Sequence, residues 1–298
     1  MFDRTRLRQR RDKAASGFHE YDFLKARVSN HLLERLSDTP HIFTRALDLG
    51  CHTGTLARGL LSHKGVEHVV ACDLSEKMAA RAKMPGIDVR QVDEEALPFE
   101  VESFDMIGSA LSLHWVNDLP GTLIQIRRAL RADGLFLGAL FGAGTLNELR
   151  TCCMEAEAEL TGGASPRISP LPGLQDMAGL MQRAGFALPV VDIDRVTVRY
   201  KSVFKLLDDL GGMGERAAFA TPQGQGLSRR ILMRMAELYA EGFSDPDGKV
   251  RASFDIIYLS GWAPAPGQPR PKKPGSATIR LADALGTTEH PANDKPRQ

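Results

Sequence analysis

The sequence predicts a doubly wound α/β protein, with a mostly parallel sheet, an antiparallel edge strand and an inserted helical cap. Three observations lead to this fold class. Short apolar runs alternate with helix-periodic segments between residues 45 and 142, a glycine-rich turn follows the first run, and a last apolar strand comes after two helical stretches. The chain of 298 residues is long enough for one large domain of this kind.

Composition narrows the possible partners. Lys and Arg number 38 against 37 Asp and Glu, so the net charge of +1 provides no broad positive field for nucleic acid. The four cysteines form no CxxC pair and no zinc-type spacing, which predicts reduced thiols in an intracellular protein. The longest apolar stretch, residues 134–144, is too short to span a bilayer.

The N-terminal part, residues 1–40, is predicted as a basic arm followed by a helix. Residues 1–17 carry six basic residues against two acidic ones, which favours a solvated arm. From residue 18 to 36 the apolar spacing fits one face of an amphipathic helix, which Pro40 ends.

The main domain is predicted over residues 41–262. Five apolar runs and one helical pattern define its first half: strands at 45–50, 68–73, 87–92, 103–110 and 134–142, with a helix at 119–131. Beyond Thr145 come a helix, an exposed loop at 162–173, a helix at 175–184 and extended chain at 187–200.

A cap and a tail complete the predicted organisation. Two helical stretches between residues 202 and 245 are predicted to form a cap at the sheet edge, before a final strand at 252–262. The tail, residues 263–298, is predicted to be largely disordered, because seven prolines and many polar residues follow residue 263.

The segment 46–60 carries the strongest local signal for a binding site. An apolar strand containing Asp48 turns through Gly50 and Gly54 into a helix. Glycine permits a tight turn and a close approach of backbone to ligand, and a helix start offers N–H donors. Many parallel sheets use such a turn for packing alone, so the turn by itself leaves function open.

Acidic residues follow the next two strands. Asp73 ends the second strand, where a carboxylate can accept hydrogen bonds from both ribose hydroxyls, and Asp93 and Glu94 follow the third. We interpret this set as a cofactor site; the alternative is solvated strand ends. Carboxylates repel phosphate. They suit S-adenosylmethionine, which carries a sulfonium and an ammonium but no phosphate.

These residues make the sequence similar to the class I S-adenosylmethionine-dependent methyltransferases over residues 40–145. The motifs are DLGCHTG, CDLS, DEEALPF and SFDMIGSALSLHWVNDLP. The resemblance implies a Rossmann-like fold, S-adenosylmethionine as cofactor, and these cofactor-binding residues: Asp48, Gly50, Cys51, His52, Gly54, Asp73, Leu74, Asp93, Glu94, Ser109 and Ala110. His52 stands where the family usually has glycine, so it lines the methionine end of the pocket, hinders the cofactor or is merely tolerated at a loop tip.

Finer resemblance comes from segments outside these motifs. SALSLHWVNDLP resembles the malonyl-carrier-protein methyltransferases and, more closely, the mitochondrial complex I assembly factors with a methyltransferase fold. The stretches FDRTRLRQRRDKAA, LLDDLGGMGERAA, DPDGKVRASFDIIYLSGW and KKPGSATI look like the second family. That resemblance implies modification, by hydroxylation, of an arginine on a complex I subunit. The alternatives are methyl transfer to a carrier-protein-bound acid and a non-catalytic assembly chaperone.

His114 and Trp115 are the candidate catalytic residues, because they follow the fourth strand, whose carboxyl end faces the donor methyl in this fold. The alternative is a core anchor and a capped loop residue. No histidine and carboxylate pattern predicts a metal site. The glycines of GGMG at 211–214 predict either a substrate-side hinge or a plain helix-ending turn.

Location follows from the first residues, since the chain begins almost at once with the segment that resembles the assembly factors. We therefore expect a bacterial cytoplasmic protein. A basic arm can also attract anionic lipid. We expect peripheral contact with the inner membrane through Arg4, Arg6, Arg8, Arg10 and Arg11.

Overall fold

The computed structural model describes residues 1–220, 228–269 and 275–288. Contacts divide the chain into two units, Met1–Pro264 and Ala265–Gln298. In the second unit the described residues include the short helix α10 (Leu281–Leu285). The tail predicted to be disordered falls partly on residues 270–274 and 289–298, which lie outside the described residues.

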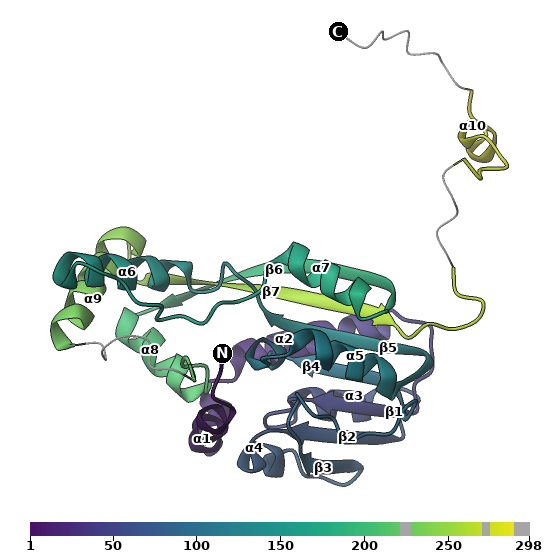
Figure 1. Ribbon diagram of the computed structural model, residues 1–298, viewed down its shortest axis with the longest axis horizontal. Coiled ribbons are helices and arrows are strands. Elements are labelled where there is room, and N and C mark those ends of the chain that lie inside the picture. The colour runs from purple at the N-terminus through teal and green to yellow at the C-terminus, as the bar shows by residue number, and fades with distance from the viewer. Residues whose placement is uncertain (221–227, 270–274, 289–298) are drawn as a thin grey trace. The chain divides into compact units, whose positions relative to one another are not determined.

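The described strands form a single sheet in the order β3-β2-β1-β4-β5-β7-β6 (Figure 1). The strands are β1 (Arg45–Leu49), β2 (His68–Asp73), β3 (Ile87–Gln91), β4 (Phe104–Ala110), β5 (Leu130–Phe141), β6 (Ala187–Tyr200) and β7 (Val250–Trp262). Strands β1 to β5 pair in parallel, and β7 is antiparallel to both β5 and β6. The predicted fold class, mostly parallel with an antiparallel edge, is confirmed.

Helices cover both faces of this sheet. They are α1 (Arg4–Ala14), α2 (Phe23–Ser37), α3 (Thr55–Ser62), α4 (Glu76–Arg81), α5 (Leu119–Ala129), α6 (Asn147–Thr161), α7 (Leu174–Arg183), α8 (Val203–Gly212) and α9 (Arg229–Phe243), with short 3₁₀ turns η1 (Phe18–Glu20) and η2 (Leu113–Trp115). Successive strand residues point to opposite faces. Ala46 of β1 therefore packs in the apolar layer of α2 and α3, and Leu47 packs in the layer of α5 and α7.

The strand order reverses between β1 and β4, which makes the carboxyl ends of these two strands the switch point of the sheet. Ligands of open α/β sheets bind in the crevice at such a point. The chain after β1 begins at Gly50, and the chain after β4 includes Ser112 and η2. The fold thus brings the predicted cofactor residues and the predicted catalytic residues to one edge.

Strands β6 and β7 are the longest pair, with a register that runs from Ala187 opposite Trp262 to Tyr200 opposite Val250. Residues 187–200, predicted as extended chain, form one continuous strand with an irregularity before Val190. The segment predicted as a cap contains α8 and α9, and α9 packs against α6 (Figure 1). Residues 221–227 of that segment lie outside the described residues.

The prediction of a solvated N-terminal arm is wrong. Residues Arg4–Ala14 form helix α1, whose start is capped by the Asp3 side chain accepting from the Arg6 backbone N–H. One face of this helix is buried through Leu7, Arg11 and Ala14. The spacings of four and three residues place these side chains on one helical face, which explains why they are buried together.

The arginines of α1 bind parts of the protein itself. Arg4 pairs with Asp93 and Glu94. Arg6 donates to the Phe219 carbonyl, and Arg10 donates to the carbonyls of Arg216 and Ala217. These contacts, with the burial of Arg11, leave Arg8 as the exposed member of the five arginines.

That arrangement removes the reason for predicting a membrane-binding arm. A helix that crosses a bilayer needs about 20 apolar residues. None of the helices in residues 1–220, 228–269 and 275–288 has the length and apolar character to do so.

Candidate functional site

The turn after β1 requires its two glycines. Gly50 has φ +71°, and a Cβ there would lie 2.1 Å from Ser112 Oγ. Gly54 has φ +81° and begins α3, and a Cβ there would lie 2.5 Å from the Cβ of Ala82. Both positions therefore combine left-handed backbone with a close approach, which a side chain would prevent.

The Asp48 side chain holds the first turn of α3 against the end of β1. Its Oδ2 accepts a hydrogen bond of 2.9 Å from the Ala57 backbone N–H in the first turn of α3. The side chain is buried, and burial raises the pKa of Asp48 to about 7, against the lowering effect of nearby Lys25. Asp48 thus supports the helix start that the ligand would face.

Asp73 and Glu94 lie together and share a cation from α1. Arg11 Nη1 lies 3.2 and 3.3 Å from the two oxygens of Asp73 and 3.0 Å from Glu94 Oε1. Asp73 also accepts from the backbone N–H groups of His52, at 3.0 Å, and Ser75, at 2.8 Å. Both carboxylates are fully buried, at 0% exposure.

The ionisation of this cluster follows from its contacts. Burial lowers the pKa of Arg11, but the charges of Asp73 and Glu94 raise it by more, so the guanidinium stays charged. Burial raises the pKa of Glu94, and the attraction of Arg11 and Arg4 brings it below its usual value. Ser112 adds hydrogen bonds to both partners, donating from Oγ to Glu94 Oε1 at 2.8 Å and accepting from Arg11 Nη2 at 3.0 Å.

The carboxylate acceptors at Asp73 and Glu94 fit S-adenosylmethionine, the cofactor that the sequence resemblance implies. Ribose hydroxyls and an ammonium need acceptors, and Asp73 and Glu94 already hold a donor cation, the Arg11 guanidinium. Because Asp73 has no exposed surface, a ribose reaches it only when Arg11 moves away. The chemistry of the site fits the cofactor, and the described conformation keeps it closed.

His52, the departure from the family pattern, is accommodated in the left-handed region at φ +48°. Its ring lies 5.4 Å from the Phe18 ring, and its Nδ1 lies 2.9 Å from the Gly50 carbonyl oxygen and in contact with Lys25 Nζ. Burial, together with Lys25 and Arg11, lowers the pKa of His52 well below its usual value, so the ring is neutral. With Lys25 and Glu215 it lines a small cavity of about 20 Å³.

Other predicted cofactor residues lie around this cluster in supporting positions. Ser109 Oγ donates to the Leu49 carbonyl at 2.7 Å and so joins β4 to β1. Ala110 belongs to the core, and Leu74 packs with Trp115 beside the N-terminus. Asp93 keeps 38% of its side chain exposed and pairs with Arg4.

The predicted catalytic residues lie in η2 and share one acceptor. His114 Nε2 is 3.0 Å from Glu215 Oε2, and Trp115 Nε1 donates to the same oxygen at 2.7 Å. Trp115 is 2% exposed and also meets the Phe2 ring edge-on at 5.1 Å. Trp115 is therefore a core anchor, and it fixes the position of a half-buried carboxylate, that of Glu215.

Sequence reasoning missed Arg11, Lys25 and Ser112. Lys25 Nζ donates to the Gly50 carbonyl at 3.2 Å, and burial lowers the pKa of Lys25 to about 8. For Arg11 the available signal was helical spacing within the first 15 residues, which a count of charges hides.

Cysteines and metal ligands add no reactive group here. The four cysteines are free and buried. Burial raises the pKa of Cys51 and Cys72 well above the usual thiol value, and raises that of Cys152 to about 11 and that of Cys153 to about 12. Within the described ranges no three His, Cys, Asp or Glu side chains are grouped to hold a metal ion.

Fold and site together define a methyltransferase-fold protein. A family model described as "Methyltransferase domain" matches residues 47–138. The YcgJ protein of Bacillus subtilis has a TM-score of 0.56 at 16% identity, over 79% of this chain and 99% of that one. A phosphoethanolamine N-methyltransferase of Haemonchus contortus, in complex with S-adenosylhomocysteine, has a TM-score of 0.54 at 19% identity, over 87% and 60%. At such identities the likeness shows the fold.

Curated relatives give the family. The arginine-hydroxylase NDUFAF5 of zebrafish, Danio rerio, is 39% identical over 95% of this chain and 89% of its own length. The human protein of that name is also 39% identical, over 95% and 83%. A malonyl-[acyl-carrier protein] O-methyltransferase of Gallionella capsiferriformans is 30% identical over 95% and 97%. The chain belongs to the methyltransferase-fold family of the NDUFAF5 proteins, and the resemblance found in the sequence is confirmed.

Proposed function

We propose that this protein binds S-adenosylmethionine and modifies an arginine side chain of a protein partner, a subunit of respiratory complex I during its assembly. The observation that carries the cofactor is the buried pair Asp73 and Glu94 beside the switch point, which already holds a cation. The arginine and its partner come from the 39% identity to proteins named arginine hydroxylases and from the assembly-factor resemblance.

Each residue of the cluster has a role in this proposal. Asp73 accepts hydrogen bonds from the ribose, Gly50 lets the backbone approach, and Asp93 and Glu94 complete the acidic side. S-adenosylmethionine, when bound, supplies a methyl group activated by its sulfonium. The protein then has to orient the acceptor and exclude water, which the closed site and the segment at Glu215 favour.

A cofactor-binding experiment tests the first half of the proposal. In Asp73→Asn the shape of the side chain is kept and its charge is removed, so charge-assisted hydrogen bonds worth about 1.5–3 kcal/mol are weakened. We expect S-adenosylmethionine affinity to fall about 10- to 150-fold by calorimetric titration. Asp88→Asn, an exposed carboxylate on β3, is the matched control and keeps the wild-type affinity. Unchanged affinity in folded Asp73→Asn contradicts the assignment.

Mass spectrometry of complex I subunits from cells with and without this protein tests the second half. A gain of one oxygen on an arginine supports the activity named for the NDUFAF5 relatives. A gain of one methyl on an arginine keeps the site and changes the reaction. A methyl ester on a carrier-bound acid supports the malonyl-type alternative, and the absence of any modified product supports an assembly chaperone.

A further inference from the structure

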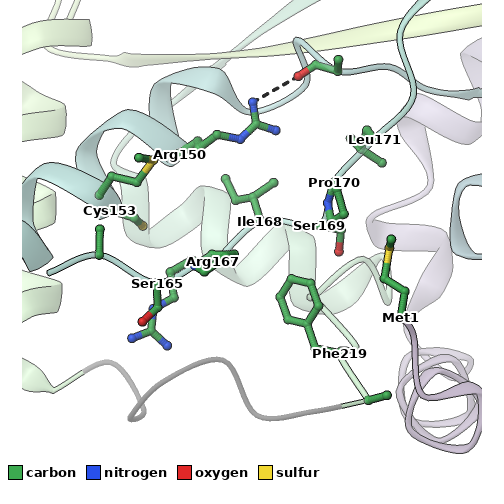
Figure 2. A pocket seen from close by; sticks show the side chains of 15 residues that line it. Met1, Arg150, Cys153, Ser165, Arg167, Ile168, Ser169, Pro170, Leu171 and Phe219 are labelled. Atoms are coloured by element: carbon green, nitrogen blue, oxygen red, sulfur yellow. Dashed lines mark hydrogen bonds between the residues drawn. The ribbon is translucent and has the colours of Figure 1, made fainter. Parts of the chain in front are cut away.

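Two cavities share one loop as a wall, and Glu215 lines the inner one. The inner one, of about 370 Å³, is lined by residues that include His114, Trp115, Phe141, Leu149, Glu215 and Phe254. The outer one, of about 630 Å³, has Ile168 and Ser169 in its wall, with Cys153 to one side and Phe219 and Met1 to the other (Figure 2). Both are lined by Arg167, Ile168, Ser169 and Leu171. One loop therefore forms a wall common to the two cavities.

The inner cavity contains an ionised carboxylate. Burial raises the pKa of Glu215, while the contact with His114 and the charge of Arg11 lower it below its usual value. His114 and Trp115 both bind Oε2, and no described residue donates a hydrogen bond to Oε1. Glu215 therefore has a free acceptor atom on a carboxylate whose position two donors fix.

His114 offers a second acceptor beside it. Since a carboxylate only accepts, Nε2 carries the proton in the contact with Glu215. The other ring nitrogen, Nδ1, is buried and has no hydrogen-bond partner among the described residues. Buried polar atoms without partners are rare in folded proteins, and this one belongs to a side chain that is 2% exposed and lines the cavity.

The walls of the inner cavity suit a cation on an apolar stem. Leu149, Leu207 and Leu210 can pack against methylene groups, and Trp115, Phe141 and Phe254 bring aromatic rings that attract a cation. A planar guanidinium presents several N–H groups in one plane and satisfies two neighbouring acceptors, whereas an ammonium is a point charge. The chemistry of this cavity favours arginine over lysine.

The outer cavity favours a polypeptide over a free amino acid. It lies against the same loop as the inner cavity, and Ser169 Oγ in that loop is buried without a partner among the described residues. The Arg167 guanidinium, which lines both cavities, pairs with Glu157, so its charge is compensated. Space and a free hydroxyl are thus available for chain on either side of one inserted residue.

We propose that the inner cavity binds one arginine side chain of a polypeptide substrate, with the guanidinium on Glu215 Oε1 and His114 Nδ1 and the flanking residues in the outer cavity. This inference rests on the proposed function, because it names the site at which the modified arginine binds. Glu215 is the residue that selects a cationic side chain, and His114 positions it.

The test uses the full chain and three synthetic peptides, GSGSRSGSG and the same sequence with lysine or citrulline in place of arginine. Ligand-observed NMR gives the affinities. We expect the wild type to prefer the arginine peptide at least tenfold over both others. In Glu215→Gln, which keeps the size of the side chain, arginine affinity falls at least tenfold; Glu67→Gln, an exposed carboxylate, keeps it.

A second variant protects the test against misfolding. Leu207 is half-buried in α8 and lines the inner cavity, so Leu207→Trp fills this cavity and leaves Glu215 unchanged. We expect this variant not to bind the arginine peptide. Equal binding of the arginine peptide by wild type and folded Glu215→Gln, or equal binding of lysine and arginine peptides, overturns the inference. Titration of the same samples with S-adenosylmethionine separates the two proposals. If the wild type binds the arginine peptide but not S-adenosylmethionine, the proposed function is refuted and the arginine site is not.

Discussion

At the scale of single residues, Arg11 compensates the charge of two buried carboxylates in the predicted cofactor site. Its guanidinium bridges Asp73 and Glu94, two carboxylates with no exposed surface. Two buried like charges repel each other unless a cation lies between them. The protein supplies this cation from its own chain, and under the proposed function S-adenosylmethionine has to displace it.

Replacing Arg11 by alanine is expected to change stability and affinity in opposite directions. Breaking a buried ion pair by removing one partner costs about 3–5 kcal/mol, so the ligand-free variant unfolds at a lower temperature. S-adenosylmethionine then binds more tightly, because it has no internal competitor. Calorimetric titration and thermal unfolding measure both, and Arg8→Ala on the exposed face of α1 is the control. Weaker cofactor binding in Arg11→Ala contradicts this role.

The sequence predicted that the carboxylates of this cluster lie at one edge of the sheet, but it did not predict the arginine that pairs with them. Gly50, Asp73 and Glu94 follow strand ends, and strand order alone brings such positions to one edge. Arg11 lies 62 and 83 residues away from its two partners, and no local pattern encodes a contact of that range. The positive charge of residues 1–17 argued for solvation, although burial becomes favourable once two carboxylates are present to pair with it.

At the scale of elements, helix α8 ends in close contact with the chain before α2. Gly212 is its last residue, and Gly214 follows with φ +77°. A Cβ on Gly212 would lie 2.4 Å from the Tyr21 ring. Of the two interpretations of the GGMG segment, a helix-ending turn describes this geometry, and the glycines also allow close packing.

Two glycine-to-alanine changes in helices are expected to have opposite effects. Alanine is favoured over glycine in a helix by about 0.5–1 kcal/mol. Gly242→Ala in α9 has no heavy atom within 4 Å of the new Cβ and should be stabilising. Gly212→Ala meets the Tyr21 ring and should destabilise by about 1–3 kcal/mol. Denaturant unfolding measures both, and a stabilised Gly212→Ala would show that α8 shifts freely.

Element boundaries show where sequence patterns stop being informative. Strand β6 contains Pro189 and is not interrupted by it, because β6 is the edge strand and needs no hydrogen-bond donor on its outer side. Strand β5 begins at Leu130, directly after α5, where the sequence still favours helix. Tertiary pairing sets both limits.

At the scale of the whole molecule, charged side chains from distant parts of the sequence gather around the turn after β1. Lys25 interacts with Asp48, Asp73 and Glu215, and Arg11 interacts with Asp73, Glu94 and Glu215. The pKa values of Glu94 and Glu215 are lowered, so their contribution to stability is present above pH 4.5 and is lost in acid. Asp48 behaves in the opposite way.

Burial raises the pKa of Asp48 from its ordinary 3.8 to about 7. An acid with a raised folded-state pKa binds its proton more tightly when folded, so its stabilising contribution is lost as the pH rises from about 4 to 7. Asp48→Asn removes this loss and should gain stability relative to wild type over that interval, by at most about 4 kcal/mol. Unfolding free energies between pH 4 and 8 measure it, with Asp88→Asn as control; parallel curves contradict the assignment.

The four cysteines have a consequence for how this molecule can be studied. A buried thiol with a raised pKa reacts with an alkylating reagent only after its surroundings open. Cys51 and Cys72 adjoin the turn after β1, and Cys152 and Cys153 lie in α6, which packs on α9. The alkylation rate of each pair therefore reports the opening free energy of its own region, so the native cysteines can measure local unfolding at the turn after β1 and at the contact of α6 with α9 separately.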